Sequence, residues 1–183
     1  MTSSSLITVK MKVEIRPSVL RGSVAAPPSK SHVHRLLIAA ALARGESRIT
    51  GAAESEDILA TVDCLGALGA SVSVAGNAFS VHGCGGAPHA GGDILPCRES
   101  GSTLRFMIPP ALTGGRVRFE GTPRLLERGV GIYEQLLGDK GIEIKKDSGG
   151  IEFSGALTAG EYVLRGDVSS QFVSGLLLAL PLL

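Results

Sequence analysis

Three short runs of small polar residues have the composition of an anion-binding site. Each run stands where a helix is expected to begin. The first N–H groups of a helix have no partner within it, and the positive end of the helix dipole favours negative charge. One helix start contributes only about 0.3–1 kcal/mol to an exposed charge, so several must act together. The runs are Ser29-Lys30-Ser31, Ser100-Gly101-Ser102 and Ser169-Ser170-Gln171.

Cations near these runs favour a phosphate or a carboxylate as the ligand. Lys30 lies in the first turn of its expected helix, and Arg35 projects from the second turn. Lysine supplies a point charge suited to phosphate, whereas arginine offers a planar fork suited to carboxylate. Gly101 would let a ligand approach the backbone closely. Arg124 is expected on a loop after a strand, either as a binding residue or as an ordinary solvated arginine.

The three runs occupy the same position in an internal repeat. Residues 31–38 align with residues 101–108, so that Arg35 and Arg105 coincide, and a third copy begins at Ser169. Fixed-period similarity indicates that one supersecondary unit is used repeatedly. If the units pack with pseudo-symmetry, the three helix starts should converge. The alternative for any one run alone is an ordinary N-cap.

Each unit is expected to fold as helix, strand, helix, strand, strand, as the first unit illustrates. Ser29 should cap a helix over residues 30–44, and a short strand should follow at 48–50. Ser55 should cap a second helix whose apolar residues share one face. Alternation over residues 72–81, with Gly and Asn in the middle, predicts a hairpin.

Three other segments complete the expected layout. Pro109-Pro110 should kink the first helix of the second unit or end it early, because proline removes a helical hydrogen bond. Alternating apolar and charged residues over 9–16 predict a half-buried strand outside the repeat. The glycine-rich stretch 83–92 is expected to be a loop between units.

Composition limits the kinds of partner and the cellular setting. The chain has 183 residues, of which 44% are hydrophobic and 19% charged, as in a globular protein. Lys and Arg total 18 against 17 Asp and Glu, so no global field attracts nucleic acid or a membrane. Three cysteines and no recognisable signal peptide favour reduced thiols and a cytoplasmic location.

Other potentially chemical residues carry little weight. The set His82, Cys84, His89 and Cys97 fits no familiar zinc-binding spacing, and residues 28–31 lack the glycines of a P-loop. His32 and His34 are expected on a helix surface.

Four motifs, in order along the chain, resemble those of the 5-enolpyruvylshikimate-3-phosphate (EPSP) synthase family. Residues 28–35 (PSKSHVHR) resemble P-x-K-S-x-x-x-R, and residues 99–105 (ESGSTLR) resemble N-[AS]-G-T-x-x-R. Residues 121–128 (GTPRLLER) are similar to G-x-x-x-[LM]-x-x-R, and residues 166–172 (GDVSSQF) to G-x-x-S-S-Q-[FY]. Two positions depart from the family pattern: Glu99 replaces Asn, which adds a negative charge beside the expected anion site, and Ser102 replaces Thr.

The resemblance implies an α/β fold of pseudo-symmetric repeats, with inner helices and outer sheets, in two lobes. Residues 23–183 would form an incomplete upper lobe. Its parts would be repeat 1 at about 27–92, repeat 2 at about 93–165 and the start of repeat 3 at 166–183. Residues 1–22 would belong with the missing lower lobe.

The resemblance also implies a reaction of the shikimate pathway, which leads to chorismate and the aromatic amino acids. The enolpyruvyl group of phosphoenolpyruvate would move to the 5-hydroxyl of shikimate 3-phosphate with release of phosphate, without metal or organic cofactor. The acid–base carboxylates would lie beyond Leu183, which leaves Lys30 as the one candidate for a catalytic role here. Shikimate 3-phosphate would be bound by Lys30, Ser31, Arg35, Ser169, Ser170 and Gln171, and phosphoenolpyruvate by Lys30, Gly101, Arg124 and Gln171.

Two alternatives stay open. One is a lobe of the related enolpyruvyl transferase that acts on UDP-N-acetylglucosamine, which shares the fold but lacks the Lys-Ser-x-x-x-Arg and Ser-Ser-Gln patterns. The other is a non-catalytic anion-binding module.

Overall fold

The first of two similar units contains five elements in the predicted order. The computed structural model of the chain describes residues 12–17, 19, 21–89 and 94–183. The elements are α1 (Lys30–Leu42), β1 (Glu46–Thr50), α2 (Glu56–Ala67), β2 (Ser71–Ala75) and β3 (Ala78–His82). The predicted cap of the second helix is confirmed, because Ser55 Oγ accepts a hydrogen bond from the N–H of Ile58 at 3.3 Å.

The second unit repeats this order with two additions, a strand at its start and a divided second helix. A third helix start follows the unit. The elements are β4 (Ile94–Arg98), α3 (Gly101–Leu112), β5 (Val117–Gly121), α4 (Pro123–Glu127), α5 (Gly131–Gly138), β6 (Glu143–Lys146), β7 (Gly150–Ser154), α6 (Ser170–Ala179) and the 3₁₀ turn η1 (Leu180–Leu182).

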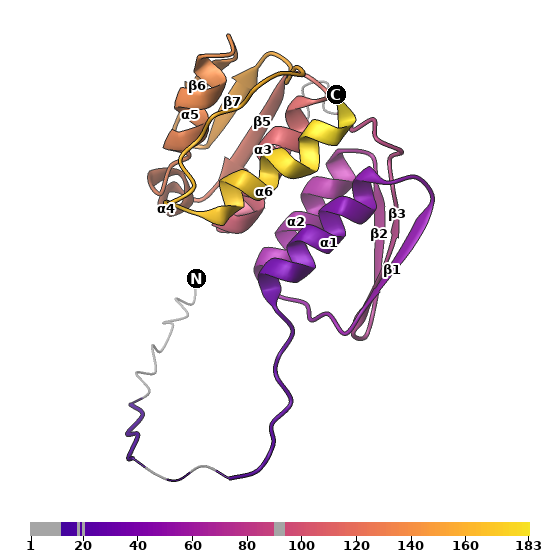
Figure 1. The fold of residues 1–183 in the computed structure, drawn as a ribbon, viewed down its shortest axis with the longest axis vertical. Coiled ribbons are helices and arrows are strands. Elements are labelled where there is room, and N and C mark those ends of the chain that lie inside the picture. Colours follow the sequence, from indigo (N-terminus) through magenta and orange to yellow (C-terminus); the bar gives the residue numbers. More distant parts are fainter. Residues whose placement is uncertain (1–11, 18, 20, 90–93) are drawn as a thin grey trace, which may run out of the picture.

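When β4 is left out, the two sheets have the same strand order, as expected if one unit is repeated. The first sheet is ordered β1-β3-β2, and the second is ordered β4-β5-β7-β6. In each, the last strand of the unit lies between the other two and is antiparallel to both. Helices α1, α2, α3 and α6 lie between the sheets (Figure 1). The chain is therefore a mixed α/β domain with its helices inside and its sheets outside.

Strand β4 has no counterpart in the described part of the first unit and was not predicted. Pro96 in its middle argues against a strand, because proline cannot donate to the sheet. The structure accommodates Pro96 at the sheet edge, where β4 pairs in parallel with β5 alone and the register shifts between Pro96 and Arg98.

Helix α3 continues through Pro109 and Pro110 to Leu112, so of the two predicted outcomes, a kink or an early end, the early end is wrong. Both prolines are buried, and the helix packs closely on α6 at this point. A Cβ added to Gly175 of α6 would lie 2.8 Å from the Arg105 carbonyl oxygen and 3.2 Å from Pro109 Cδ. Tertiary packing therefore overrides the local preference of proline.

The expected strand over residues 9–16 is not found where the structure can test it. Residues 12–17 form no strand, and Val13 and Ile15 are 72% and 88% exposed. Residues 9–11 lie outside the described residues, as do 90–92 of the predicted loop; residues 83–89 are irregular, as predicted.

Both units contribute to one continuous hydrophobic core. Phe79 of the first sheet, Phe119 and Phe153 of the second, and Phe106 of α3 are all fully buried in it. The helices between the sheets are therefore held in place from both sides. In the described part of the chain, no helix is long and apolar enough to cross a membrane.

Candidate anion-binding site

All three predicted helix starts are helix N-termini capped by a serine. Each serine has extended backbone angles and a side-chain oxygen that accepts a hydrogen bond from the first turn. Ser29, Ser100 and Ser169 accept from the N–H groups of His32, Thr103 and Gln171 at 3.4, 3.2 and 3.3 Å. The residues between cap and acceptor have N–H groups with no partner among the described residues: Lys30, Ser31, Gly101, Ser102 and Ser170.

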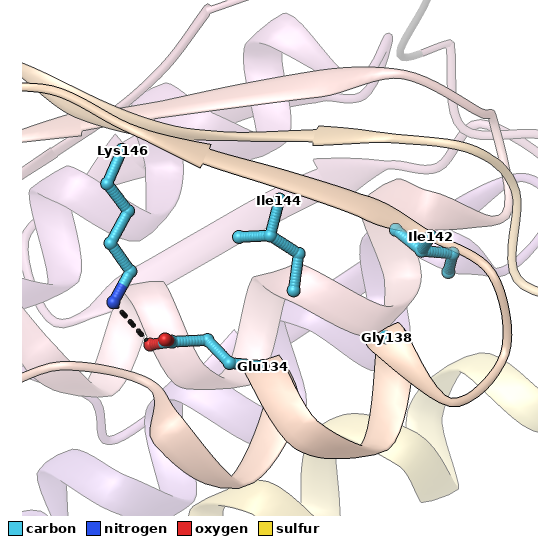
Figure 2. Close-up of a pocket in the computed structure, with 5 residues that line it drawn as sticks. All are labelled: Glu134, Gly138, Ile142, Ile144 and Lys146. Atoms are coloured by element: carbon cyan, nitrogen blue, oxygen red, sulfur yellow. Dashed lines mark hydrogen bonds and ion pairs between the residues drawn. The ribbon is translucent and has the colours of Figure 1, made fainter.

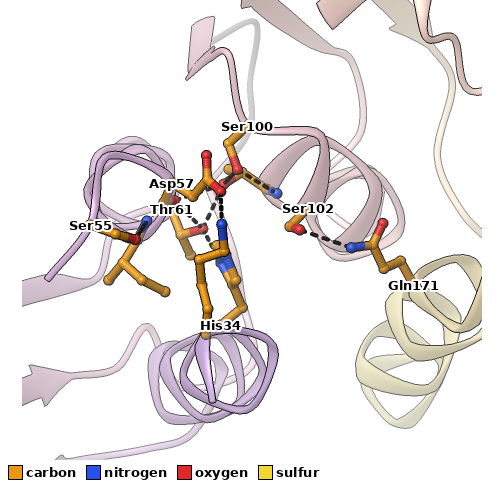
Figure 3. A network of polar contacts seen from close by, with 10 residues as sticks. His34, Ser55, Asp57, Thr61, Ser100, Ser102 and Gln171 are labelled. Atoms are coloured by element: carbon orange, nitrogen blue, oxygen red, sulfur yellow. Dashed lines mark hydrogen bonds and ion pairs between the residues drawn. The ribbon is translucent and has the colours of Figure 1, made fainter. Parts of the chain in front are cut away.

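Polar contacts join these N-termini to one another and to that of α2 (Figure 3). Lys30 forms an ion pair with Asp57 in the first turn of α2. The hydroxyl of Thr103 donates to the backbone carbonyl of Asp57 at 3.1 Å, and Gln171 Nε2 donates to Ser102 Oγ at 2.8 Å. The predicted convergence of the helix starts is therefore observed, and the N-terminus of α2 joins them, which was not predicted.

Arg35 is held between three helices. Its Nε donates to Ser174 Oγ of α6 at 3.0 Å, and its Nη1 donates to the Ser31 carbonyl at 2.9 Å. The guanidinium carbon lies 4.8 Å from the ring centroid of Phe106 on α3. The group is half-buried and orientationally fixed, which suits recognition of a planar or tetrahedral anion.

Arg124 lies on a helix and not on the predicted loop. Thr122 caps the short helix α4, and Pro123 occupies its first turn, where proline is favoured. The Arg124 side chain is 81% exposed, and its Nη1 lies 3.3 Å from Glu99 Oε1. Glu99, which stands where the resembling motif has Asn, therefore pairs with Arg124.

Two further arginines, which were not predicted as site residues, belong to this region. Arg105 Nη1 donates to Gln171 Oε1 at 3.0 Å, and burial, followed by the charge of Arg128, lowers its pKa. The Arg128 guanidinium lies 3.4 Å from where a Cβ on Gly101 would stand. Both arginines end motifs that were aligned with the family, which was the available signal.

Charge at the site is only partly neutralised. Lys30 and Arg124 each have a carboxylate partner, Asp57 and Glu99 respectively. The cations without a carboxylate partner among the described residues are Arg35, Arg105 and Arg128. Unpaired cations beside free helix N–H groups can hold a multiply charged anion.

His34 is fully buried beneath the site, so its predicted place on the helix surface is wrong. Its Nδ1 lies 2.7 Å from Thr61 Oγ1, which lies 2.8 Å from Thr103 Oγ1 (Figure 3). Burial lowers the pKa of His34 to about 4, against a smaller opposing effect of Asp57, so the imidazole is neutral at pH 7. Its Nε2 has no hydrogen-bond partner among the described residues.

The hollow between α5 and β6 is a different feature. It has a volume of about 450 Å³ and is lined by Glu134, Gly138, Ile142, Ile144 and Lys146 (Figure 2). Its one lysine pairs with its one carboxylate at 2.6 Å, and none of its residues belongs to the four motifs. It therefore has no part in the anion site.

Comparisons with known proteins agree with the motifs. A family profile described as EPSP synthase (3-phosphoshikimate 1-carboxyvinyltransferase) matches residues 15–183. The 3-phosphoshikimate 1-carboxyvinyltransferase of Clostridium kluyveri is 44% identical over 174 residues, which are 93% of this chain and 41% of that protein. The protein of the same name from Methanocorpusculum labreanum is 37% identical over 176 residues, covering 94% of this chain and 42% of that protein.

Solved structures show the same relationship at the level of the fold. EPSP synthase from Acinetobacter baumannii matches with a TM-score of 0.66 and 26% identity, over 86% of this chain and 37% of that one. The enolpyruvyl transferase NikO from Streptomyces tendae shares the fold, with a TM-score of 0.52 and 18% identity over 86% of this chain and 37% of that one. The chain spans about two fifths of the length of the curated relatives described above. With a family profile that covers nearly all of its residues, the chain belongs to the EPSP synthase family.

Proposed function

We propose that this chain binds shikimate 3-phosphate as the N-terminal part of an enzyme that transfers the enolpyruvyl group of phosphoenolpyruvate to it. The observation that carries the proposal is the meeting of four helix N-termini, joined by Lys30–Asp57, Thr103–Asp57 and Gln171–Ser102. Such a site suits an anion better than a neutral ligand, because free N–H groups and unpaired arginines surround it.

The two substrates would share the site. Shikimate 3-phosphate would contact Lys30, Ser31, Arg35, Ser169, Ser170 and Gln171, which is supported by the free N–H groups of Ser31 and Ser170. Phosphoenolpyruvate would contact Lys30, Gly101, Arg124 and Gln171, which is supported by the free N–H of Gly101 and the exposure of Arg124. Lys30, common to both sets, would have to exchange its ion pair with Asp57 for ligand contacts.

The cations of this chain would act by positioning and by electrostatics. Two anionic substrates repel one another, and fixed arginines offset that repulsion while holding the reacting atoms close. The 5-hydroxyl oxygen would lose its proton and bond to C2 of phosphoenolpyruvate, while the methylene carbon of phosphoenolpyruvate gains a proton. Loss of phosphate and of a methyl proton would then restore the double bond. The groups that move these protons would come from the part of the relatives that this chain does not span.

That remaining part is the proposed partner of this chain. The two units would be the first two of a three-unit lobe, with α6 as the start of the third. Leu177 of α6 is 65% exposed and Leu36 of α1 is 38% exposed, so an apolar surface is available beside the inner helices. The rest of the third unit would cover this surface, and residues before about 23 would pair with a second lobe.

Calorimetric titration of the chain tests the proposal. Saturable binding of shikimate 3-phosphate, weakened by Lys30→Ala, is expected, with no comparable binding of UDP-N-acetylglucosamine. Preference for the UDP-sugar would instead favour the related transferase. Equal binding of sulfate, citrate and shikimate 3-phosphate would favour a generic anion-binding module and contradict the proposal.

A further inference from the structure

A buried polar relay connects α1, α2 and α3 directly below the anion site. His34 Nδ1 lies 2.7 Å from Thr61 Oγ1, and Thr61 Oγ1 lies 2.8 Å from Thr103 Oγ1. Thr103 Oγ1 in turn lies 2.7 Å from Ser100 Oγ and 3.1 Å from the Asp57 carbonyl oxygen. His34 comes from α1, Thr61 from α2, and Thr103 and the cap residue Ser100 from α3, and all four are buried (Figure 3).

The outer end of the relay consists of groups that would face a ligand in the proposed site. Ser100 is the N-cap of α3, and the N–H groups of Gly101 and Ser102 that follow it have no partner in the part of the chain that the structure describes. Asp57 is the ion-pair partner of Lys30. A change in the hydrogen bonds of the Thr103 hydroxyl would therefore alter the direction of the N–H groups of Gly101 and Ser102. It would also alter the position of Asp57, the ion-pair partner of Lys30.

An imidazole at this place is unfavourable for packing alone. The side chain is fully buried beside the ring of Phe106, with ring centroids 5.8 Å apart, and its Nε2 has no partner among the described residues. An apolar side chain of similar size would avoid burying this unpaired nitrogen. What the imidazole supplies and an apolar side chain cannot is the hydrogen bond to Thr61, which fixes the relay at its inner end.

We infer that His34 is a positioning residue of the substrate site, which acts through Thr61 and Thr103 to fix the N-terminus of α3 relative to α1 and α2. The inference rests on the proposed function for the identity of the ligand. The geometric part of the inference, the link from His34 to the first turn of α3, does not depend on any ligand.

Substitution of His34 in this chain tests both parts. His34→Leu removes the hydrogen bond to Thr61, whereas His34→Asn keeps a polar atom near the place of Nδ1. In the ligand-free chain, His34→Leu should shift the amide NMR signals of Gly101 and Ser102, which His34 does not touch. His34→Leu should also lower the affinity for shikimate 3-phosphate by a factor on the order of ten or more, as expected when binding groups are misplaced. His34→Asn should restore most of both losses.

The matched control is His32→Leu, the same change on an exposed side chain of the same helix, which should leave both readouts unaltered. If His34→Leu does not fold, Thr61→Val, which is isosteric, interrupts the same relay and carries the same expectations. Amide signals of Gly101 and Ser102 at their parental positions in a folded variant would overturn the inference. If the parent chain binds shikimate 3-phosphate, an unchanged affinity of the variant for this ligand would also overturn the inference. A parent chain that does not bind shikimate 3-phosphate would refute the proposed function, while the amide signals would still decide the role of His34.

Discussion

Arg124 Nη1 lies 3.3 Å from Glu99 Oε1 at the edge of the anion site. The carboxylate of Glu99 thus forms an ion pair with Arg124, a cation that the proposed function assigns to phosphoenolpyruvate binding. A ligand carboxylate or phosphate must compete with it for Arg124. Both side chains are more than half exposed, so solvent screens the pair and the competition is modest.

Replacing Glu99 with Gln should therefore strengthen phosphoenolpyruvate binding. Exposed ion pairs contribute about 0.2–1 kcal/mol, so the expected gain in affinity is about 1.5-fold to fivefold, and it should shrink as salt rises. Titration calorimetry at low and moderate ionic strength measures it. Glu127→Gln on the neighbouring helix α4 is the matched control, since Glu127 has no ion pair among the described residues. Weaker binding by Glu99→Gln would show that the carboxylate takes part in binding instead of opposing it.

Arg35→Ala should weaken the binding of shikimate 3-phosphate more than the binding of phosphoenolpyruvate, and it should also lower the stability of the fold. A hydrogen bond to a charged group contributes about 1.5–3 kcal/mol, which corresponds to at least tenfold in affinity. The loss of stability follows because Arg35 ties Ser31 of α1 to Ser174 of α6. Calorimetry and thermal unfolding measure the two effects. Arg44→Ala, at the exposed end of the same helix region, should change neither, and an equal loss of affinity for both substrates would contradict the assignment of Arg35.

Acidification should destabilise the chain through His34. Burial lowers the folded-state pKa to about 4, whereas the unfolded side chain titrates near 6.5. Between these values the unfolded state binds the proton and the folded state does not, so stability falls as pH drops from about 6.5 to about 4. The full effect is about 3 kcal/mol. Urea unfolding at pH 7 and pH 5 should show a smaller pH-dependent loss in His34→Leu than in the parent, and equal losses would contradict the burial of a neutral imidazole.

Gly175→Ala should disrupt the packing of α6 on α3. A Cβ at this position would lie 2.4 Å from Tyr133 Oη and 2.8 Å from the Arg105 carbonyl oxygen, so the helices would have to separate. Overpacking of this kind costs about 1–3 kcal/mol. Gly66→Ala in α2 is the control, because a Cβ at this position would meet nothing within 4 Å. The substitution should stabilise the helix by about 1 kcal/mol, because alanine has a higher helix propensity than glycine. Urea unfolding should give a lower free energy of unfolding for Gly175→Ala and a higher one for Gly66→Ala than for the parent chain.

Features that depend on neighbouring residues were predictable from the sequence. Ser29, Ser55, Ser100 and Ser169 cap helices through contacts within three residues of each cap, and the repeated order of elements follows from local periodicity. The convergence of the helix starts followed from the repeat itself. A shared strand order requires equivalent helices to occupy equivalent places.

Features that depend on distant packing were not predictable. His34 has the sequence context of a surface residue, and its burial results from Thr61 of α2 and Phe106 of α3 closing over it. The pairing of Asp57 with Lys30 was not predicted, because it requires α1 and α2 to lie side by side. The proline of β4 concealed an edge strand for the same reason, since only the assembled sheet shows which strands lie at its edge.

The 183-residue chain by itself is expected to bind substrate without turning it over. It spans 41% of its Clostridium kluyveri relative, and Asp57 and Glu99, the carboxylates seen in ion pairs at the site, are bound to Lys30 and Arg124. A carboxylate that neutralises a cation of the proposed site is poorly placed to move protons, so the acid–base groups are expected in the part of the relatives that this chain does not span. Phosphate release would be measured with both substrates, first for the chain alone and then with the remaining segment of the Clostridium kluyveri protein added. Activity that requires the added segment is expected, and turnover by the chain alone at a rate typical of enzymes, about 1 s⁻¹ or more, would refute the division of the site.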